Sequence, residues 1–200
     1  MAVDRKEQIY ETATQLFAWR GYNGASVRDI ARQLDLQGGS LYSHITTKEE
    51  LLWTILERAA DQFLGVIEPI AWSDLSPAEK LRAAVHAHVG VVASNLEAAT
   101  VYFHEWKFLT RPRREQFLAR RRLYEHAMRA IVSEGVAAGV FRPQIDPTFA
   151  TLAVLSIVNW LSTWYDPDGP LSPAEIADTF LSLLLNGLLV PEALSEEVPS

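Results

Sequence analysis

Residues 26–48 read S-V-R-D-I-A-R-Q-L-D-L-Q-G-G-S-L-Y-S-H-I-T-T-K, and they predict a helix, a tight turn and a second short helix. Ser26 is a preferred residue at a helix N-terminus, and Asp29 follows it at the spacing of a capping box. Apolar residues then recur at helical spacing up to Leu34. The pattern breaks at residues 35–37, and a second helix is expected from near Gly38. Two short helices joined by such a turn are typical of helix-turn-helix DNA-binding motifs.

The remainder of the chain carries helix signals and no alternating strand pattern, so the sequence predicts an all-α fold of about nine helices. Besides the two helices of the motif, helices are expected over 4–20 (ended by Gly21), from Thr47 to Ile67 or beyond, after Ser76, over 97–109, over 112–138, after Asp146 and after Ser172. A break is expected at 69–74. We expect a three-helix DNA-binding domain over residues 1–48, a larger helical ligand-binding and dimerisation domain over 49–190, and an acidic tail over 191–200.

Composition narrows the class of protein. The chain has 200 residues, no cysteine and a formal net charge of −7. Lack of cysteine excludes disulfides and thiolate chemistry and fits the reducing cytosol, where we expect the protein to act. Residues up to Arg58 carry −1 of this charge and the remainder carries −6. An acidic body with a near-neutral head suits site-specific DNA binding, in which local Arg and Lys placement matters most. Neither a signal peptide nor a membrane span is expected.

The second helix of such a motif places its first residues against base edges in the major groove. In this chain those residues are Gln37, Gly38, Gly39, Ser40, Tyr42 and His44. The two glycines allow the backbone to approach closely and leave base reading to the other four. Ser26, at a helix N-terminus, is a candidate phosphate ligand, and Arg28 is placed to contact a base or a phosphate.

The same region is similar to a known family. The N-terminal part of the chain resembles the DNA-binding domain of TetR-family transcriptional repressors. The residues that carry the resemblance are Arg5, Ile9, Ala13, Phe17, Gly21-Tyr22, Ser26-Val27, Asp29-Ile30-Ala31, Gly39-Ser40-Leu41-Tyr42, Lys48-Glu49 and Leu51-Leu52. The resemblance implies that Tyr42, Thr47 and Lys48 contact phosphates of double-stranded DNA. It also implies a homodimer on a palindromic operator, with two reading helices about 34 Å apart.

The last two predicted helices are candidates for the dimer seam. The helix after Asp146 is apolar nearly all round, so none of its faces suits water. The alternative is that both helices are ordinary core. The residues expected at the seam are Ala153, Ile157, Phe180, Leu183, Leu184, Gly187 and Leu188.

Polar residues within apolar stripes indicate either a buried network or a ligand pocket, because an unpaired buried polar group is costly. In the first interpretation Arg121 pairs with Glu105, and His88 and Asn159 bond to the backbone. In the second these groups line a pocket with aromatic walls. The candidate ligand-binding residues are His88, Tyr102, Glu105, Trp106, Arg121, Tyr124, Asn159 and Trp160.

The C-terminal part resembles TetR-type regulators of fatty-acid and related acyl-CoA degradation. The resemblance lies in residues 102–109, 120–124, 159–160 and 164–165, with Gly169 following. It implies an acyl-CoA effector and no cofactor. An apolar tunnel would hold the acyl chain, and Arg or Lys near its mouth would hold the phosphates. Six arginines between 111 and 122 supply such charge, although a solvated basic face is the alternative. A multidrug or aromatic-compound sensor of the same family is the other function considered.

Other functional classes find less support in the sequence. No nucleophile elbow, phosphate loop or dinucleotide fingerprint is present, so we expect no enzyme. His86 and His88 are two residues apart and diverge on a helix, which does not make a metal clamp. A metal sensor using His88, His104 and Glu105 is a weaker possibility. The expected mechanism is a population shift, in which an effector favours a state with helix 47–67 swung and the two heads misplaced on DNA.

Overall fold

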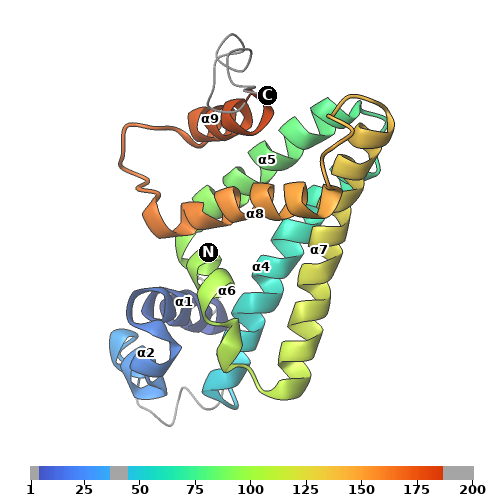
Figure 1. Cartoon of the computed structure of the whole chain (residues 1–200). Helices are drawn as coiled ribbons and strands as arrows, with labels where there is room; N and C mark the ends of the chain where they lie inside the picture. The colour runs from blue at the N-terminus through green and yellow to red at the C-terminus, as the bar shows by residue number, and fades with distance from the viewer. Residues whose placement is uncertain (1–4, 37–44, 187–200) are drawn as a thin grey trace, which may run out of the picture.

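The computed structural model describes residues 5–36 and 45–186, and these form α-helices and one 3-10 helix with no strand among them (Figure 1). The elements are α1 (Arg5–Gly24), α2 (Val27–Gln33), α4 (Lys48–Ala71), α5 (Pro77–Ser94), α6 (Leu96–His104), η1 (Trp106–Phe108), α7 (Arg111–Ala137), α8 (Pro147–Trp164) and α9 (Pro173–Asn186). The all-α prediction is confirmed. The helix expected from Gly38 and the tail over 191–200 lie outside the described residues.

The N-terminal head consists of α1 and α2 packed against the first turns of α4. Ile9, Phe17, Ile30 and Leu52 are at most 1% exposed and form its centre. The capping box predicted at Ser26 is present: the Ser26 hydroxyl accepts from Asp29 N at 3.1 Å, and the Asp29 carboxylate accepts from Ser26 N at 2.9 Å. These bonds fix where α2 begins.

The body is a layered helical bundle. In Figure 1, α4 and α7 run side by side, α8 crosses them, and α9 lies near α5. Phe63, Ile67, Val85, Met128 and Val158, contributed by α4, α5, α7 and α8, are at most 2% exposed at its centre. The long helix α4 belongs to both parts, so it connects the head directly to the body. None of the helices in the described ranges is long and apolar enough to cross a membrane.

Two predicted helix boundaries were wrong. A break was predicted from residue 69, but helix α4 continues through Pro69 to Ala71. The proline lies in the last turn, where it removes only one backbone hydrogen bond, and the buried side chains of Ile67 and Ala71 still hold that turn. The helix expected over 97–109 is divided: α6 ends at His104, and η1 follows after Glu105. At Gly21, where the first helix was predicted to end, a φ of 71° and a ψ of 160° interrupt the helical geometry, and helical residues continue beyond this kink to Gly24.

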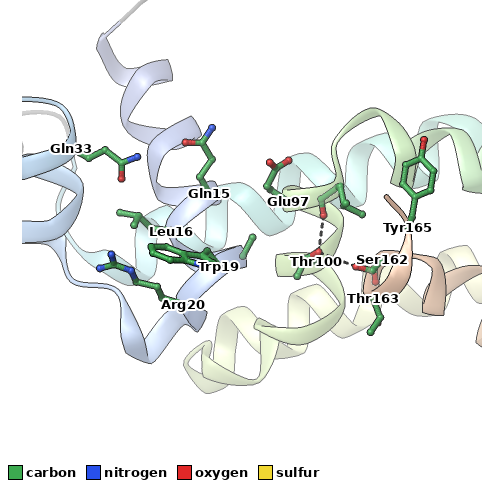
Figure 2. Close-up of a pocket in the computed structure, with 12 residues that line it drawn as sticks. Gln15, Leu16, Trp19, Arg20, Gln33, Glu97, Thr100, Ser162, Thr163 and Tyr165 are labelled. Carbon is green, nitrogen blue, oxygen red and sulfur yellow. Dashed lines mark hydrogen bonds between the residues drawn. The ribbon is translucent and has the colours of Figure 1, made fainter. Parts of the chain in front are cut away.

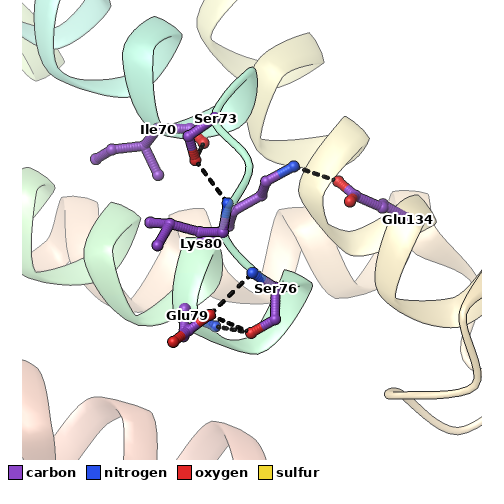
Figure 3. Close-up of polar contacts among 7 residues, drawn as sticks. Ile70, Ser73, Ser76, Glu79, Lys80 and Glu134 are labelled. Carbon is purple, nitrogen blue, oxygen red and sulfur yellow. Dashed lines mark hydrogen bonds and ion pairs between the residues drawn. The ribbon is translucent and has the colours of Figure 1, made fainter.

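A buried lysine near the start of α5 pairs with a glutamate near the end of α7 (Figure 3). Lys80 is 5% exposed, and its Nζ lies 2.7 Å from a carboxylate oxygen of Glu134. The start of α5 is held by a capping box in which Ser76 N donates to Glu79 at 2.9 Å. Pro77 occupies the first helical position there, as the sequence predicted.

Candidate DNA-reading head and effector cavity

The described part of the predicted DNA surface lies at the starts of α2 and α4. Ser26, Arg28 and Thr47 are exposed. Thr47 caps α4 by accepting from Glu50 N at 3.1 Å, while the Glu50 carboxylate accepts from Thr46 N at 2.7 Å. The other predicted DNA contacts, Gln37, Gly38, Gly39, Ser40, Tyr42 and His44, lie outside the described residues.

Lys48 is packed against an aromatic side chain of the head. Its Nζ lies 4.0 Å from the ring centroid of Tyr22, and burial lowers the pKa of its ammonium group. A cation over a ring face is attracted by the ring quadrupole. Lys48 therefore holds the start of α4 against the end of α1.

The head also contacts the body through Glu105. A carboxylate oxygen of Glu105 accepts a hydrogen bond from Tyr22 N at 2.7 Å. The Tyr22 ring stacks on Phe108 of η1 with centroids 5.6 Å apart. The predicted pairing of Glu105 with Arg121 is therefore wrong, because the break after α6 turns Glu105 toward α1. Arg121 instead lies 5.8 Å from the centroid of a Trp106 ring.

A second head–body contact lies beside the first. Glu49, in the first turn of α4, accepts from Thr110 N at 2.9 Å and from the Thr110 hydroxyl at 2.8 Å. Burial opposes ionisation of Glu49, but the Thr110 bonds and the Arg113 charge outweigh it and lower the pKa of this carboxyl. The segment 105–110 is thus bonded to both α1 and α4.

A cavity of about 180 Å³ lies in the body between α4, α5, α6, α7 and α8. It is lined by Phe63, His88, Tyr102, Phe103, Leu118, Arg121, Arg122, Tyr124, Glu125, Leu155 and Asn159. The most buried lining residues are Phe63, His88, Tyr102 and Tyr124, whereas Arg122 is exposed. The cavity therefore has an aromatic inner wall and an outer rim that includes arginine.

Five of the eight candidate ligand-binding residues meet at this cavity: His88, Tyr102, Arg121, Tyr124 and Asn159. Glu105, Trp106 and Trp160 do not line it. Trp160 is 61% exposed on the outer side of α8. Sequence reasoning did not single out Phe63, Phe103, Leu118 or Leu155 for this site, because apolar residues at helical spacing look alike whether they fill a core or line a cavity.

The cavity contains a hydrogen-bonded pair. His88 Nδ1 lies 2.8 Å from the Tyr124 hydroxyl oxygen, and both residues are buried. Burial lowers the pKa of His88 to about 3 and raises the pKa of Tyr124, so both groups are neutral at pH 7. Burial also raises the pKa of Tyr102 to about 12.

Charge at the rim comes from the Glu125 carboxylate, which pairs with Arg129, and from two arginines, Arg121 and Arg122. Three of their neighbours along the chain pair with carboxylates: Arg111 with Glu115, Arg113 with Glu49 and Arg120 with Asp61. Within the described ranges neither Arg121 nor Arg122 has a carboxylate at ion-pair distance. The rim therefore offers two guanidinium groups to an anion.

An exposed apolar surface covers α8 and α9. Phe149, Leu152, Trp160 and Trp164 of α8 are 44–75% exposed, and Leu183 of α9 is 43% exposed. Ala153 and Leu183 are exposed, and Ile157, Phe180 and Leu184 are half-buried. The remaining predicted seam residues, Gly187 and Leu188, lie outside the described residues. Large exposed apolar patches mark association surfaces.

A groove of about 690 Å³ separates the head from the body (Figure 2). Figure 2 shows Trp19 and Arg20 of α1 on one side and Thr100 of α6 on the other. Ser162, at the end of α8, accepts at its backbone oxygen from the Thr100 hydroxyl at 3.4 Å. No sequence pattern indicated this groove, which leaves open space beside α1. No group of three metal-ligating side chains gathers anywhere in the described ranges.

Two family models and a known transcriptional repressor match this chain. Residues 9–53 match the family model "Bacterial regulatory proteins, tetR family", and residues 74–188 match "Tetracyclin repressor-like, C-terminal domain". The transcriptional repressor KstR2 of Mycolicibacterium smegmatis is 31% identical over 92% of this chain and 90% of its own length.

Two solved structures extend this comparison. The regulator PfmR of Thermus thermophilus is 35% identical with a TM-score of 0.84, over 94% of this chain and all of that one. AibR, solved with isovaleryl coenzyme A and operator DNA, is 31% identical with a TM-score of 0.81, over 90% of this chain and 97% of that one. The chain belongs to the TetR family. It is a DNA-binding transcriptional repressor and not an enzyme.

Proposed function

We propose that this repressor is a homodimer that leaves its operator when the cavity binds an acyl-CoA. The observation that carries the proposal is the cavity itself, with an aromatic inner wall and two arginines without carboxylate partners at its rim. An acyl chain suits such a wall, and guanidinium groups suit the phosphates of coenzyme A. The relative AibR, solved with isovaleryl coenzyme A, supports the same class of effector.

The cavity volume limits the acyl group. An engineered cavity of about 150 Å³ in another protein holds benzene, so about 180 Å³ suits an acyl group of five or six carbons. The coenzyme portion would extend past Arg121 and Arg122 into solvent. We infer that short acyl thioesters are the effectors.

The segment from Tyr102 to Thr110 would transmit the signal to the head. Tyr102 and Phe103 line the cavity, while Glu105 bonds to Tyr22 of α1 and Thr110 bonds to Glu49 of α4. An acyl group that displaces Tyr102 or Phe103 would shift the segment and swing α1 and α4 together, and the groove beside α1 gives room for that motion. A roughly 100-fold preference of effector for the swung state supplies about 2.7 kcal/mol per site, a substantial part of typical operator specificity.

The apolar surface of α8 and α9 would form the dimer seam. Each head alone contacts few bases, and a symmetric dimer doubles the site on a palindrome. A second copy on this surface would cover the exposed Phe149, Leu152 and Trp160. The predicted DNA contacts of the head remain part of this proposal.

A thermal-unfolding panel tests the effector class without knowledge of the operator. Ligand at 100 times its dissociation constant adds about 2.7 kcal/mol to the free energy of unfolding, and the melting temperature rises by several degrees. We expect stabilisation by short acyl-CoAs and none by the free acids or by coenzyme A alone. An Arg121→Gln/Arg122→Gln variant should lose most of that shift. Stabilisation by aromatic acids or lipophilic cations, with none by any thioester, would replace the acyl-CoA assignment with an aromatic-compound or multidrug sensor.

A further inference from the structure

The His88–Tyr124 pair leaves one nitrogen without a partner. His88 is 2% exposed and Tyr124 is 6% exposed. Nδ1 of His88 lies 2.8 Å from the Tyr124 oxygen, but Nε2 has no hydrogen-bond partner within the described part of the chain. A buried polar atom of this kind is costly, so its presence in a cavity wall calls for a reason.

The tautomer follows from which groups carry protons. Both side chains are neutral, so the phenol holds one proton and the imidazole holds one. When Tyr124 donates to Nδ1, its hydroxyl proton is satisfied and the ring proton sits on Nε2. The opposite arrangement would leave the Tyr124 proton without an acceptor. Nε2–H is therefore a hydrogen-bond donor with nothing to donate to.

The surroundings of the imidazole are aromatic and uncharged. Its ring centroid lies 4.9 Å from that of Phe63 and 6.2 Å from that of Phe103. The arginines that line the same cavity, Arg121 and Arg122, belong to its less buried side. An anion at the buried end would lack a charged partner and would be strongly disfavoured. Nε2 itself has almost no accessible surface, so a neutral oxygen reaches this donor only when the aromatic side chains around it move aside, and it then brings no charge that needs a partner.

We propose that the acyl group of the effector carries an uncharged oxygen, a ketone or a hydroxyl, that accepts a hydrogen bond from His88 Nε2–H. This inference rests on the proposed function. It assigns the arginine rim to the coenzyme and the inner wall to the acyl group, and so gives the repressor a preference among thioesters of equal length. Plain aliphatic thioesters would leave the donor unpaired.

The test compares pentanoyl-CoA with its 3-oxo and 4-oxo derivatives by isothermal titration calorimetry. We expect the wild-type protein to bind at least one oxo-thioester about ten-fold more tightly than pentanoyl-CoA, which is the range of one neutral hydrogen bond to a buried donor. His88→Phe keeps an aromatic ring and removes the donor, so it should abolish that preference. His88→Phe/Tyr124→Phe is the matched control, since it also removes the phenol that His88→Phe leaves unpaired.

The outcomes separate this inference from the proposed function. Equal or tighter binding of pentanoyl-CoA by the wild type, or an oxo preference that survives in both variants, would overturn the role of His88 and leave the acyl-CoA repressor standing. Failure of every thioester to bind the wild-type protein would overturn the proposed function first. Loss of the preference in both variants, with pentanoyl-CoA still bound, would establish the inference.

Discussion

Glu105 is one of the carboxylates, with Glu49, that link the head to the body. Its carboxylate accepts from Tyr22 N at 2.7 Å, immediately after Gly21 with its positive φ. Helical periodicity indicated the inner face of its helix and suggested Arg121 as its partner. The helix ends at His104, so the face assigned by periodicity did not apply one residue later. Periodicity assigns a face only while the helix continues.

Substitution of Glu105 should uncouple effector binding from DNA release. In Glu105→Ala the Tyr22 N–H loses its acceptor, which costs about 1–3 kcal/mol of head–body contact. We expect thioester affinity to stay within about two-fold of wild type while the effect of thioester on operator affinity falls. Glu105→Gln retains an acceptor oxygen and serves as the control. Full operator release by Glu105→Ala would exclude this carboxylate from the signal path.

His88 makes a distinct contribution to the pH dependence of stability. Its pKa is about 3 in the folded protein and near its ordinary value of 6.5 when unfolded. Below pH 6.5 the unfolded chain binds a proton that the folded chain does not, so this contribution is complete above pH 6.5 and is lost as pH falls toward 3. Between pH 7 and pH 5 the wild type should lose about 2 kcal/mol more than His88→Phe. Urea unfolding at both pH values measures the difference, and parallel losses would show that His88 is not buried as described.

At the scale of elements, the N-terminal starts of helices were the most predictable features. Ser26, Thr47, Ser76 and Asp146 each cap a helix at the position where the sequence indicated one. These signals are local, because a side-chain oxygen and a backbone N–H three residues later decide them. The passage of α4 through Pro69 was not predictable, since it depends on tertiary burial of Ile67 and Ala71.

The junction of α5 with α7 gives a stability prediction. Glu134→Ala leaves the Lys80 ammonium buried without its partner and should lower the free energy of unfolding by about 1–3 kcal/mol. Lys80→Met removes the charge and keeps an apolar stem of similar length, so it should cost less. Chemical denaturation of both variants ranks them. A larger loss in Lys80→Met would mean that the ion pair itself stabilises the junction.

At the scale of the whole molecule, the sequence predicted the all-α class and a helical body following a DNA-binding head. It also identified five polar or aromatic residues on inward helix faces that line the cavity: His88, Tyr102, Arg121, Tyr124 and Asn159. It did not separate the cavity from the core, because the two differ in packing between distant helices. Trp160 shows the limit most clearly: it was a candidate ligand-binding residue, but it does not line the cavity and is 61% exposed.

That exposure makes Trp160 a probe of the proposed dimer. Trp160→Glu places a charge in the α8–α9 surface and should shift the protein to a monomer in analytical ultracentrifugation, because an unpaired charge is costly in an apolar seam. Trp72→Glu is the matched control: Trp72 directly follows α4, is 63% exposed, and its ring lies beside His126 of α7. Equal dimer stability in the two variants would place the seam elsewhere.

The most direct test of the central claim is operator release. Operator sequences would be selected from a random duplex library with the purified protein, and affinity for labelled operator would be measured by fluorescence anisotropy at fixed salt, with and without saturating short acyl-CoA. The account predicts that the thioester weakens operator binding by roughly 100-fold or more, while coenzyme A alone has little effect. Unchanged operator affinity at a thioester concentration that saturates the cavity would contradict it.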